Sequence, residues 1–169
     1  DIFSTVYQVE KDPLLKIRVE ETISWVISDM VTSDGGICSA IDADSEGVEG
    51  KYYVWKSKEI DDLLQNDSNQ FKSIFGVTEA GNFEGKNILF FNGSVADLSD
   101  ESIIRSRSVL LNDRAKRVSP LLDDKILTDW NGLMIGALAR ASKIFSNESW
   151  VGYAEKAYEF IINNLIIDD

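Results

Sequence analysis

The first of two acidic stretches suited to chemistry covers residues 42–50, which carry four carboxylates within nine residues. Hard cations such as Ca²⁺ prefer several oxygen ligands at alternating positions, so the stretch resembles a calcium-binding loop. However, the twelfth position of an EF-hand starting at residue 42 would be Tyr53 instead of the bidentate glutamate, which argues against that motif. A looser cation site and a solvated turn whose aspartates bond their own backbone both stay open. The four carboxylates belong to Asp42, Asp44, Glu46 and Glu49.

The second acidic stretch runs from Asp123 to Gly132 and combines carboxylates with a tryptophan and an amide. An indole ring can stack on a sugar face, Asp and Asn side chains can bind hydroxyl groups, and two carboxylates can exchange protons with a substrate. These residue types favour a carbohydrate site. The spacing alone fits ordinary helix capping at least as well, with Thr128 or Asp129 starting a helix and Trp130 entering the core.

The sequence lacks histidine and has a single cysteine, Cys38. These 169 residues therefore cannot supply a Ser-His-Asp or Cys-His arrangement, and they lack the commonest general acid or base. One cysteine also excludes an internal disulfide and a multi-cysteine zinc site. Because Cys38 falls in a predicted strand, we expect it to be a small buried apolar group rather than a nucleophile.

Apolar periodicity predicts the elements that position the two acidic stretches. Asp12-Pro13 is typical of a helix start, and Asp34-Gly35-Gly36 ends that helix. Residues 130–145 and 150–165 form the clearest helices, and the short break between them predicts an antiparallel helical hairpin. Further helices are predicted at 57–64, 69–75 and 99–117, a loop at 76–85, a strand-like segment at 87–91, and a hairpin of strands at 37–41 and 51–55.

Size and charge limit the classes of function. A chain of 169 residues with 44% hydrophobic residues has the composition of one globular domain or part of one. Its net charge of −12 argues against nucleic-acid binding and against docking on an anionic membrane. The chain begins at Asp1 without a methionine, from which we expect a piece excised from a longer protein. We further expect a cytoplasmic location, with neither a cofactor nor a metal.

Five cationic residues fall on the predicted helix at 99–117 of this acidic chain. Anion binding is one interpretation of them. The other is a solvated helix face whose cations stabilise the helix near its C-terminus. These residues are Arg105, Arg107, Arg114, Lys116 and Arg117.

Three motifs, in the same order along the chain, resemble the YyaL family of thioredoxin-domain-containing proteins, which includes the spermatogenesis-associated thioredoxin-like proteins. The first motif runs from Gly35 to Trp55 and contains the first acidic stretch. The second runs from Asn82 to Leu89. The third covers residues 114–120 and continues through the second acidic stretch to Met134, so the resemblance spans most of the chain.

The resemblance implies a mainly α fold that is part of an (α/α)6 toroid of helical hairpins, with a small β-hairpin near residues 37–55. Such toroids are similar to N-acylglucosamine 2-epimerases and six-hairpin glycosidases. Residues 1–169 would be a fragment of that single domain, and the family's thioredoxin-like domain has no counterpart in this sequence. The related epimerases use histidines for proton transfer, so the lack of histidine here puts an epimerase-like mechanism in doubt.

From this resemblance we predict a carbohydrate-related domain with a sugar ligand, and a glycosidase- or epimerase-like activity is the hypothesis. The two acidic stretches would then line one cleft at a rim of the toroid. The alternatives are a non-catalytic scaffold beside a thioredoxin-like domain, or a cation-binding loop at 42–49. Exposed apolar helix faces predict self-association or contacts with the rest of a longer chain. The catalytic candidates are Asp124, Asp129 and Asp44, and the substrate-binding candidates are Asp42, Glu46, Trp130 and Asn131.

Overall fold

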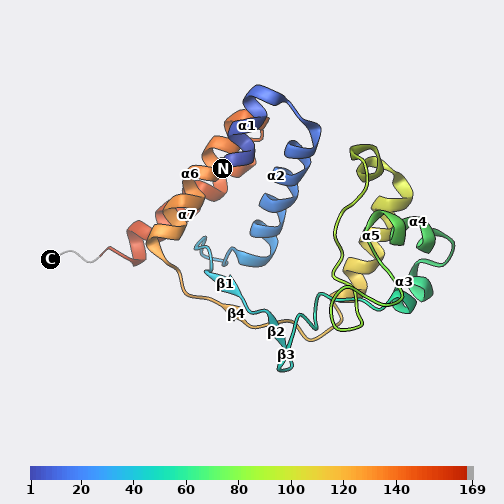
Figure 1. Cartoon of the computed structure of the whole chain (residues 1–169). Helices are drawn as coiled ribbons and strands as arrows, with labels where there is room; N and C mark the ends of the chain where they lie inside the picture. Colours follow the sequence, from blue (N-terminus) through green and yellow to red (C-terminus); the bar gives the residue numbers. More distant parts are fainter. Residues whose placement is uncertain (167–169) are drawn as a thin grey trace. The chain divides into compact units, whose positions relative to one another are not determined.

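The computed structural model describes residues 1–166 and is mainly α-helical, as predicted (Figure 1). The chain divides into two compact units. Unit 1 consists of residues 1–41 and the described residues from 122 onward, and unit 2 is Asp42–Leu121. Within residues 1–166, no helix combines the length and the apolar character needed to cross a bilayer.

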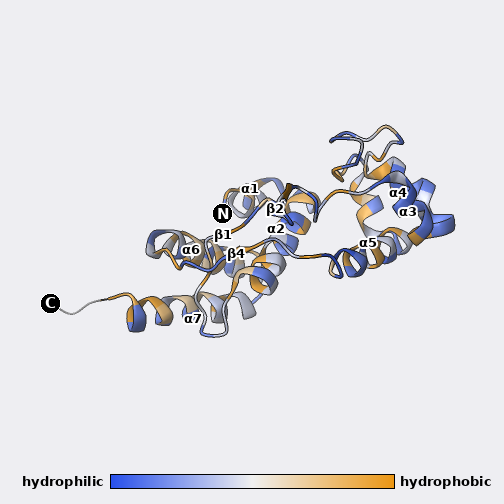
Figure 2. Ribbon diagram, turned by 90° about the horizontal axis from the view of Figure 1, so that it is seen from below, coloured by the Kyte–Doolittle hydropathy of each residue, from blue (hydrophilic) through white to orange (hydrophobic). Residues whose placement is uncertain are grey.

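Unit 1 is built from two pairs of helices. The longest helices, α6 and α7, pack against each other as the predicted hairpin and lie side by side in Figures 1 and 2. The first helix, α1, packs on both α2 and α6 and was not expected from the sequence. The elements are α1 (Ile2–Glu10), α2 (Pro13–Trp25), the π-helical turn η1 (Val26–Met30), α6 (Thr128–Phe145) and α7 (Ser149–Asn164).

A local sequence signal accounts for the start of the predicted N-terminal helix, whereas the helical segment ends at Met30, before the predicted stop at Asp34-Gly35-Gly36. Asp12 caps α2, because its carboxylate accepts a hydrogen bond from the Leu14 N–H at 2.8 Å. After η1, the chain turns sharply at Gly35, whose φ of +96° suits glycine. A Cβ added at Gly35 would lie 2.9 Å from the Cβ of Lys156 on α7, so the turn also needs glycine for close packing.

The core of unit 1 lies where η1 and α2 meet the α6–α7 hairpin. Small side chains allow close helix packing at its centre, where Ala141 and Ala157 are at most 1% exposed. Cys38 belongs to this core, as predicted. The fully buried members also include Val19, Ile23, Val26, Met30, Ile37, Leu138, Trp150 and Ala154.

The strands differ from the predicted hairpin of residues 37–41 with 51–55, which is wrong in its partners. In unit 1, β1 (Ala40–Ile41) pairs antiparallel with β4 (Leu122–Asp123). In unit 2, β2 (Asp44–Ser45) pairs with β3 (Val48–Glu49), so the real hairpin lies inside the acidic stretch. Residues 51–54 are turn and coil, and Trp55 forms only an isolated bridge with Asn87.

Unit 2 consists of short helices around an aromatic and aliphatic core. α3 is mainly hydrophilic in Figure 2, and its apolar residues Ile60 and Leu64 are buried. The helix predicted from Ser99 starts two residues later, because the Asp100 carboxylate accepts from the Ser102 N–H at 2.8 Å. The helices are α3 (Ser57–Leu64), η2 (Gln65–Asp67), α4 (Ser68–Ile74), η3 (Val95–Ser99) and α5 (Glu101–Arg114).

Candidate functional site

The seven predicted site residues fall into two groups. Unit 2 contains the candidates of the first acidic stretch, and unit 1 contains those of the second. The two groups thus belong to different units, and the shared cleft stays a prediction. Unit 2 holds Asp42, Asp44 and Glu46, and unit 1 holds Asp124, Asp129, Trp130 and Asn131.

The first acidic stretch forms a tight, self-braced hairpin. Glu46 and Gly47, with φ of 54° and 73°, occupy its two-residue turn, which is the positive-φ geometry that suits paired strands. The Asp42 carboxylate accepts from the Asp44 N–H at 3.1 Å, and Glu46 pairs with Lys51 at 2.6 Å. All three candidate carboxylates are exposed. These contacts agree with the solvated-turn interpretation, and a binding role for this group stays a prediction.

The cation-binding alternative was also left open for the first acidic stretch. Among residues 1–166, no three acidic or cysteine side chains are grouped so that they could hold a metal ion. The geometry of this hairpin gives no support to that alternative, and no cation site is proposed.

Asn131 is a buried clamp in unit 1. Its side-chain oxygen accepts from the Ile37 N–H at 3.0 Å, and its amide nitrogen donates to the Ile37 carbonyl at 2.9 Å and to the Leu127 carbonyl at 3.0 Å. The residue is only 2% exposed. Because these bonds occupy its amide, the structure gives Asn131 the role of joining the start of α6 to residue 37. These backbone contacts explain the burial of Asn131 without a sugar-binding role.

Trp130, the neighbour of Asn131, lies at the surface and is 52% exposed. This differs from the interpretation that placed it in the core. It lines a cavity of ≈ 190 Å³ together with Trp25, which ends α2 and is 47% exposed. The remaining walls come mainly from η1, residues 37–39 and Met134. Two half-exposed indoles at one small cavity form a surface on which a flat apolar ligand face can stack.

The carboxylates of the second acidic stretch belong to the same unit as this cavity, although none of them lines it. Asp129 precedes Trp130 in the first turn of α6, and its carboxylate accepts from the Trp130 N–H at 2.9 Å. Asp124 is exposed and has no hydrogen-bond or ion-pair partner among residues 1–166. Asp123 instead pairs with Lys125 at 2.7 Å, and the hydrogen bond from Lys125 lowers the pKa of Asp123 below its ordinary value. Asp124 and Asp129 are thus exposed carboxylates without an ion-pair partner among the described residues, unlike Asp123.

Cys38 lines the same cavity but is only 6% exposed. Burial has the largest effect and raises the pKa of its thiol, and the negative charge of Asp124 raises it further. A backbone hydrogen bond lowers this pKa, and the charge of Asp123 has the smallest raising effect. A raised pKa keeps the thiol neutral, so it cannot serve as an activated nucleophile near neutral pH. This confirms the expectation of a buried apolar group.

The Cys38 environment predicts slow alkylation. At pH 8 we expect iodoacetamide to modify native Cys38 at least about tenfold more slowly than the same chain unfolded in guanidinium chloride, because burial and the raised pKa both reduce accessible thiolate. As the pH is raised, the modification rate of native Cys38 should reach half of its maximum at a higher pH than the rate of the unfolded chain does. Mass spectrometry of the modified chain measures both rates, and equal rates in the two states would contradict the prediction.

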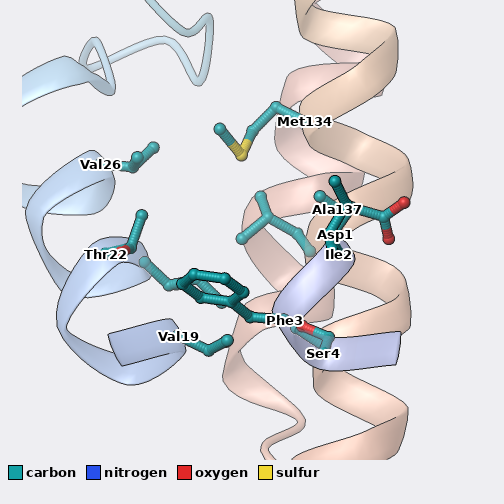
Figure 3. Close-up of a pocket in the computed structure, with 12 residues that line it drawn as sticks. Asp1, Ile2, Phe3, Ser4, Val19, Thr22, Val26, Met134 and Ala137 are labelled. Carbon is teal, nitrogen blue, oxygen red and sulfur yellow. The ribbon is translucent and has the colours of Figure 1, made fainter. Parts of the chain in front are cut away.

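A larger cavity of ≈ 390 Å³ in unit 1 is apolar over most of its wall. It lies between α1, α2 and α6, and Figure 3 shows Phe3, Val26 and Met134 around it. Its few polar side chains include Ser4, which is 1% exposed. The wall has one carboxylate, that of Asp1, and therefore lacks the paired acids of a hydrolytic site.

Two further residues matter in the structure and were not singled out from the sequence. In the sequence, Trp25 is one more apolar residue of the predicted helix, so no pattern indicated that its side chain would be exposed. Asn87 is 1% exposed, and its amide bonds the Thr78 N–H and carbonyl at 3.0 Å each and the Trp55 carbonyl at 3.2 Å. It repeats in unit 2 the clamp that Asn131 forms in unit 1. The sequence signal that could have identified Asn87 was its place within the motif from Asn82 to Leu89.

The arginines of the predicted basic helix do not simply face solvent. Arg117 donates to the carbonyls of Tyr52 and Val54 at 3.0 and 2.8 Å and stacks over the Trp55 ring at 4.0 Å. Arg114 lies 5.2 Å from the Tyr52 ring. These two arginines therefore hold the aromatic segment at 52–55, which was taken for a strand, by hydrogen bonds and cation–π contacts.

The fold and the site define a mainly helical chain of two units with an indole-lined cavity in unit 1. No family model matches the chain. Its homologues include spermatogenesis-associated protein 20 of Homo sapiens, 26% identical over 94% of this chain and 25% of that protein, and the Rattus norvegicus protein of the same name, 26% identical over 95% and 25%. An uncharacterized protein of Caenorhabditis elegans is 30% identical over 85% of this chain and 25% of its own length. The chain spans about a quarter of the length of these relatives. They agree with the resemblance that the three motifs indicate.

Proposed function

We propose that unit 1 binds a carbohydrate at the cavity between Trp25 and Trp130. The observation that carries the proposal is the pair of half-exposed indoles on one small cavity. Exposing a large aromatic surface has a cost in water, which a sugar ring stacked on it would remove. The volume of ≈ 190 Å³ is below that of drug-sized pockets, which favours one ring placed across the opening.

In this proposal, Asp124 and Asp129 bind a sugar's hydroxyls. Asp124 is exposed, has no hydrogen-bond or ion-pair partner among the described residues, and belongs to the same unit as the cavity. Asp129 occupies the first turn of α6 beside Trp130. Both carboxylates can accept hydroxyl hydrogen bonds, and charge-assisted hydrogen bonds are among the stronger ones. Asn131 acts as a positioning residue that keeps Trp130 at the surface.

A sugar-processing reaction extends this proposal. In it, the chain is a fragment of an (α/α)6 toroid, and Asp124 and Asp129 exchange protons with the bound sugar as a glycosidase or epimerase would require. The α6–α7 hairpin and the packing of α1 on α2 and α6 support paired helices as the building block. Asp44 belongs to unit 2, and its catalytic role stays a prediction.

Titration with neutral monosaccharides tests the binding proposal. With glucose, mannose and N-acetylglucosamine as probes, we expect at least one to change tryptophan fluorescence and to show saturation transfer in NMR. Replacing Trp130 or Trp25 by alanine should weaken that binding by about three- to tenfold, the range expected for one lost aromatic contact. Both readouts use the whole chain.

Leu133→Ala is the matched control, because Leu133 lies on the same helix, is 76% exposed and does not line the cavity. The control should bind sugar like the parent chain. Failure of all three sugars to bind, or equal weakening by Leu133→Ala, would contradict the proposal.

The second candidate function is a non-catalytic interaction module. Exposed apolar side chains on α6 and α7 favour it, since Leu133, Tyr158 and Ile162 are 76%, 57% and 40% exposed. Asp124→Asn and Asp129→Asn separate the two functions in the same titration. Lost sugar binding with unchanged stability supports the carbohydrate site, whereas lost stability with unchanged ligand binding supports the module.

A further inference from the structure

A second hollow, of ≈ 490 Å³, lies entirely within unit 2 and has a strongly cationic wall. Five cationic side chains and two carboxylates, Glu46 and Glu59, line it, which leaves a net charge of +3. The chain as a whole carries −12. The cations are Lys51, Lys56, Lys86, Lys116 and Arg117.

These cations come from separate segments, so the fold and not one helix face concentrates them. Lys51 and Lys56 flank the aromatic turn before α3, and Lys86 closes the tight turn with Phe83. Lys116 and Arg117 follow the end of α5 and are the only two that belong to the basic cluster noticed in the sequence. Gathering like charges in one hollow is unfavourable unless counter-charges compensate it.

The acidic groups of the protein compensate only part of this charge. Lys51 pairs with Glu46 at 2.6 Å and Lys116 with Asp113 at 3.0 Å. Glu59 accepts from the backbone N–H of Lys56 at 2.7 Å, so it caps α3 rather than pairing with an ammonium group. The ammonium groups of Lys56 and Lys86 have no hydrogen-bond or ion-pair partner within residues 1–166.

Arg117 gives the hollow a rigid cationic edge. Its two hydrogen bonds to carbonyls and its stacking over Trp55, which is 2% exposed, hold the guanidinium in place. Both hydrogen bonds use Nη1, so Nε and Nη2 keep their donors available for an anion. A fixed guanidinium loses little conformational entropy when it binds an anionic oxygen.

We propose that this hollow binds the phosphate group of a small phosphorylated molecule. A phosphate ester carries a charge of about −1.5 to −2 and three acceptor oxygens, which suits a wall of net charge +3 better than a single carboxylate does. The volume is typical of a small-molecule site. An extended polyanion is disfavoured, because the rest of the chain would repel it.

Isothermal titration of the whole chain at low ionic strength tests the proposal, with inorganic phosphate, pyrophosphate and glycerol 3-phosphate as probes and glycerol as the neutral comparison. If glycerol 3-phosphate binds more tightly than inorganic phosphate, the ligand is a phosphate ester. If the two bind with equal affinity, the hollow recognises the phosphate group alone. We expect glycerol not to bind, and added salt to weaken the phosphate probes.

Lys56→Ala with Lys86→Ala should raise the Kd of the phosphate probes by about tenfold or more, because two charge-assisted contacts are lost. The matched control is Lys58→Ala with Lys143→Ala, which removes the same charge at exposed lysines outside the hollow. The control should change Kd by less than about twofold, as expected from screened long-range charge alone. Far-UV circular dichroism confirms that both double variants fold.

Absence of binding by all three phosphate probes would overturn the proposal. Equal weakening by the two double variants would also overturn it, since only general electrostatic attraction would then remain. None of these results depends on sugar binding in unit 1, so the two proposals fail independently.

Discussion

Replacing Asn131 by alanine is expected to destabilise unit 1 by about 3 kcal/mol, because a buried donor or acceptor left without its partner costs about 1–3 kcal/mol. The substitution removes all three hydrogen bonds that join α6 to Ile37 and Leu127. It leaves the Ile37 N–H and carbonyl without these partners at a position that is 6% exposed. A drop of this size would be a large fraction of the stability of a small domain.

Hydrogen exchange measured by mass spectrometry, together with urea unfolding, tests this prediction. Protection should fall in the peptides that cover residues 31–38 and 127–141. Asn131→Asp keeps one acceptor but places a buried carboxylate opposite two carbonyl oxygens, so its loss should be at least as large as that of Asn131→Ala. Asn163→Ala on α7 is the control, since Asn163 is exposed and its side chain has no hydrogen-bond partner within residues 1–166. A loss below about 1 kcal/mol for Asn131→Ala would rule out the clamp, given what buried unpaired groups usually cost.

Replacing Asn87 by alanine should destabilise unit 2 by a similar amount, about 3 kcal/mol, for the same reason. Its amide pairs with both backbone groups of Thr78 and with the Trp55 carbonyl. The side chain therefore closes the loop between α4 and Asn87 against the segment before α3. Without it, the Thr78 N–H loses its hydrogen bond in a part-buried place.

Asn92→Ala is the control for Asn87→Ala, because Asn92 is exposed and only its backbone N–H takes part in a hydrogen bond, to the Ile74 carbonyl. Hydrogen exchange of residues 53–57 and 76–88 should report the loss of protection in the Asn87 variant and not in the control. If the two variants lost equal stability, the clamp would have no special role in unit 2.

The helices could largely be predicted from the sequence, because their signals are local. Each of these signals involves residues within a few helical turns of one another. Examples are the Asp12-Pro13 cap, the apolar residues that follow it and the small residues of α6. Gly47 and Gly50 adopt positive φ, which glycine's freedom in turns favours. The α1 helix lacked such signals: Asp1 makes no capping bond, and its packing partners α2 and α6 lie elsewhere in the sequence.

The strand partners could not be predicted, because pairing joins segments that are distant along the chain. Residues 37–41 and 51–55 both have strand-like composition, and a local hairpin was the simplest expectation. β1 instead pairs with β4, some eighty residues further on, and Trp55 bridges to Asn87. Composition indicates that a segment can pair, whereas the fold determines its partner.

By itself, the sequence determined which chemistries are present: carboxylates and indoles, no histidine, and one cysteine. Only the tertiary structure decided which of these groups a ligand can reach. Trp130 and Asn131 are neighbours, yet the indole is half exposed and the amide is 2% exposed and fully engaged. The reason is helical geometry, since successive residues point about 100° apart and the packing of α6 selects the buried side.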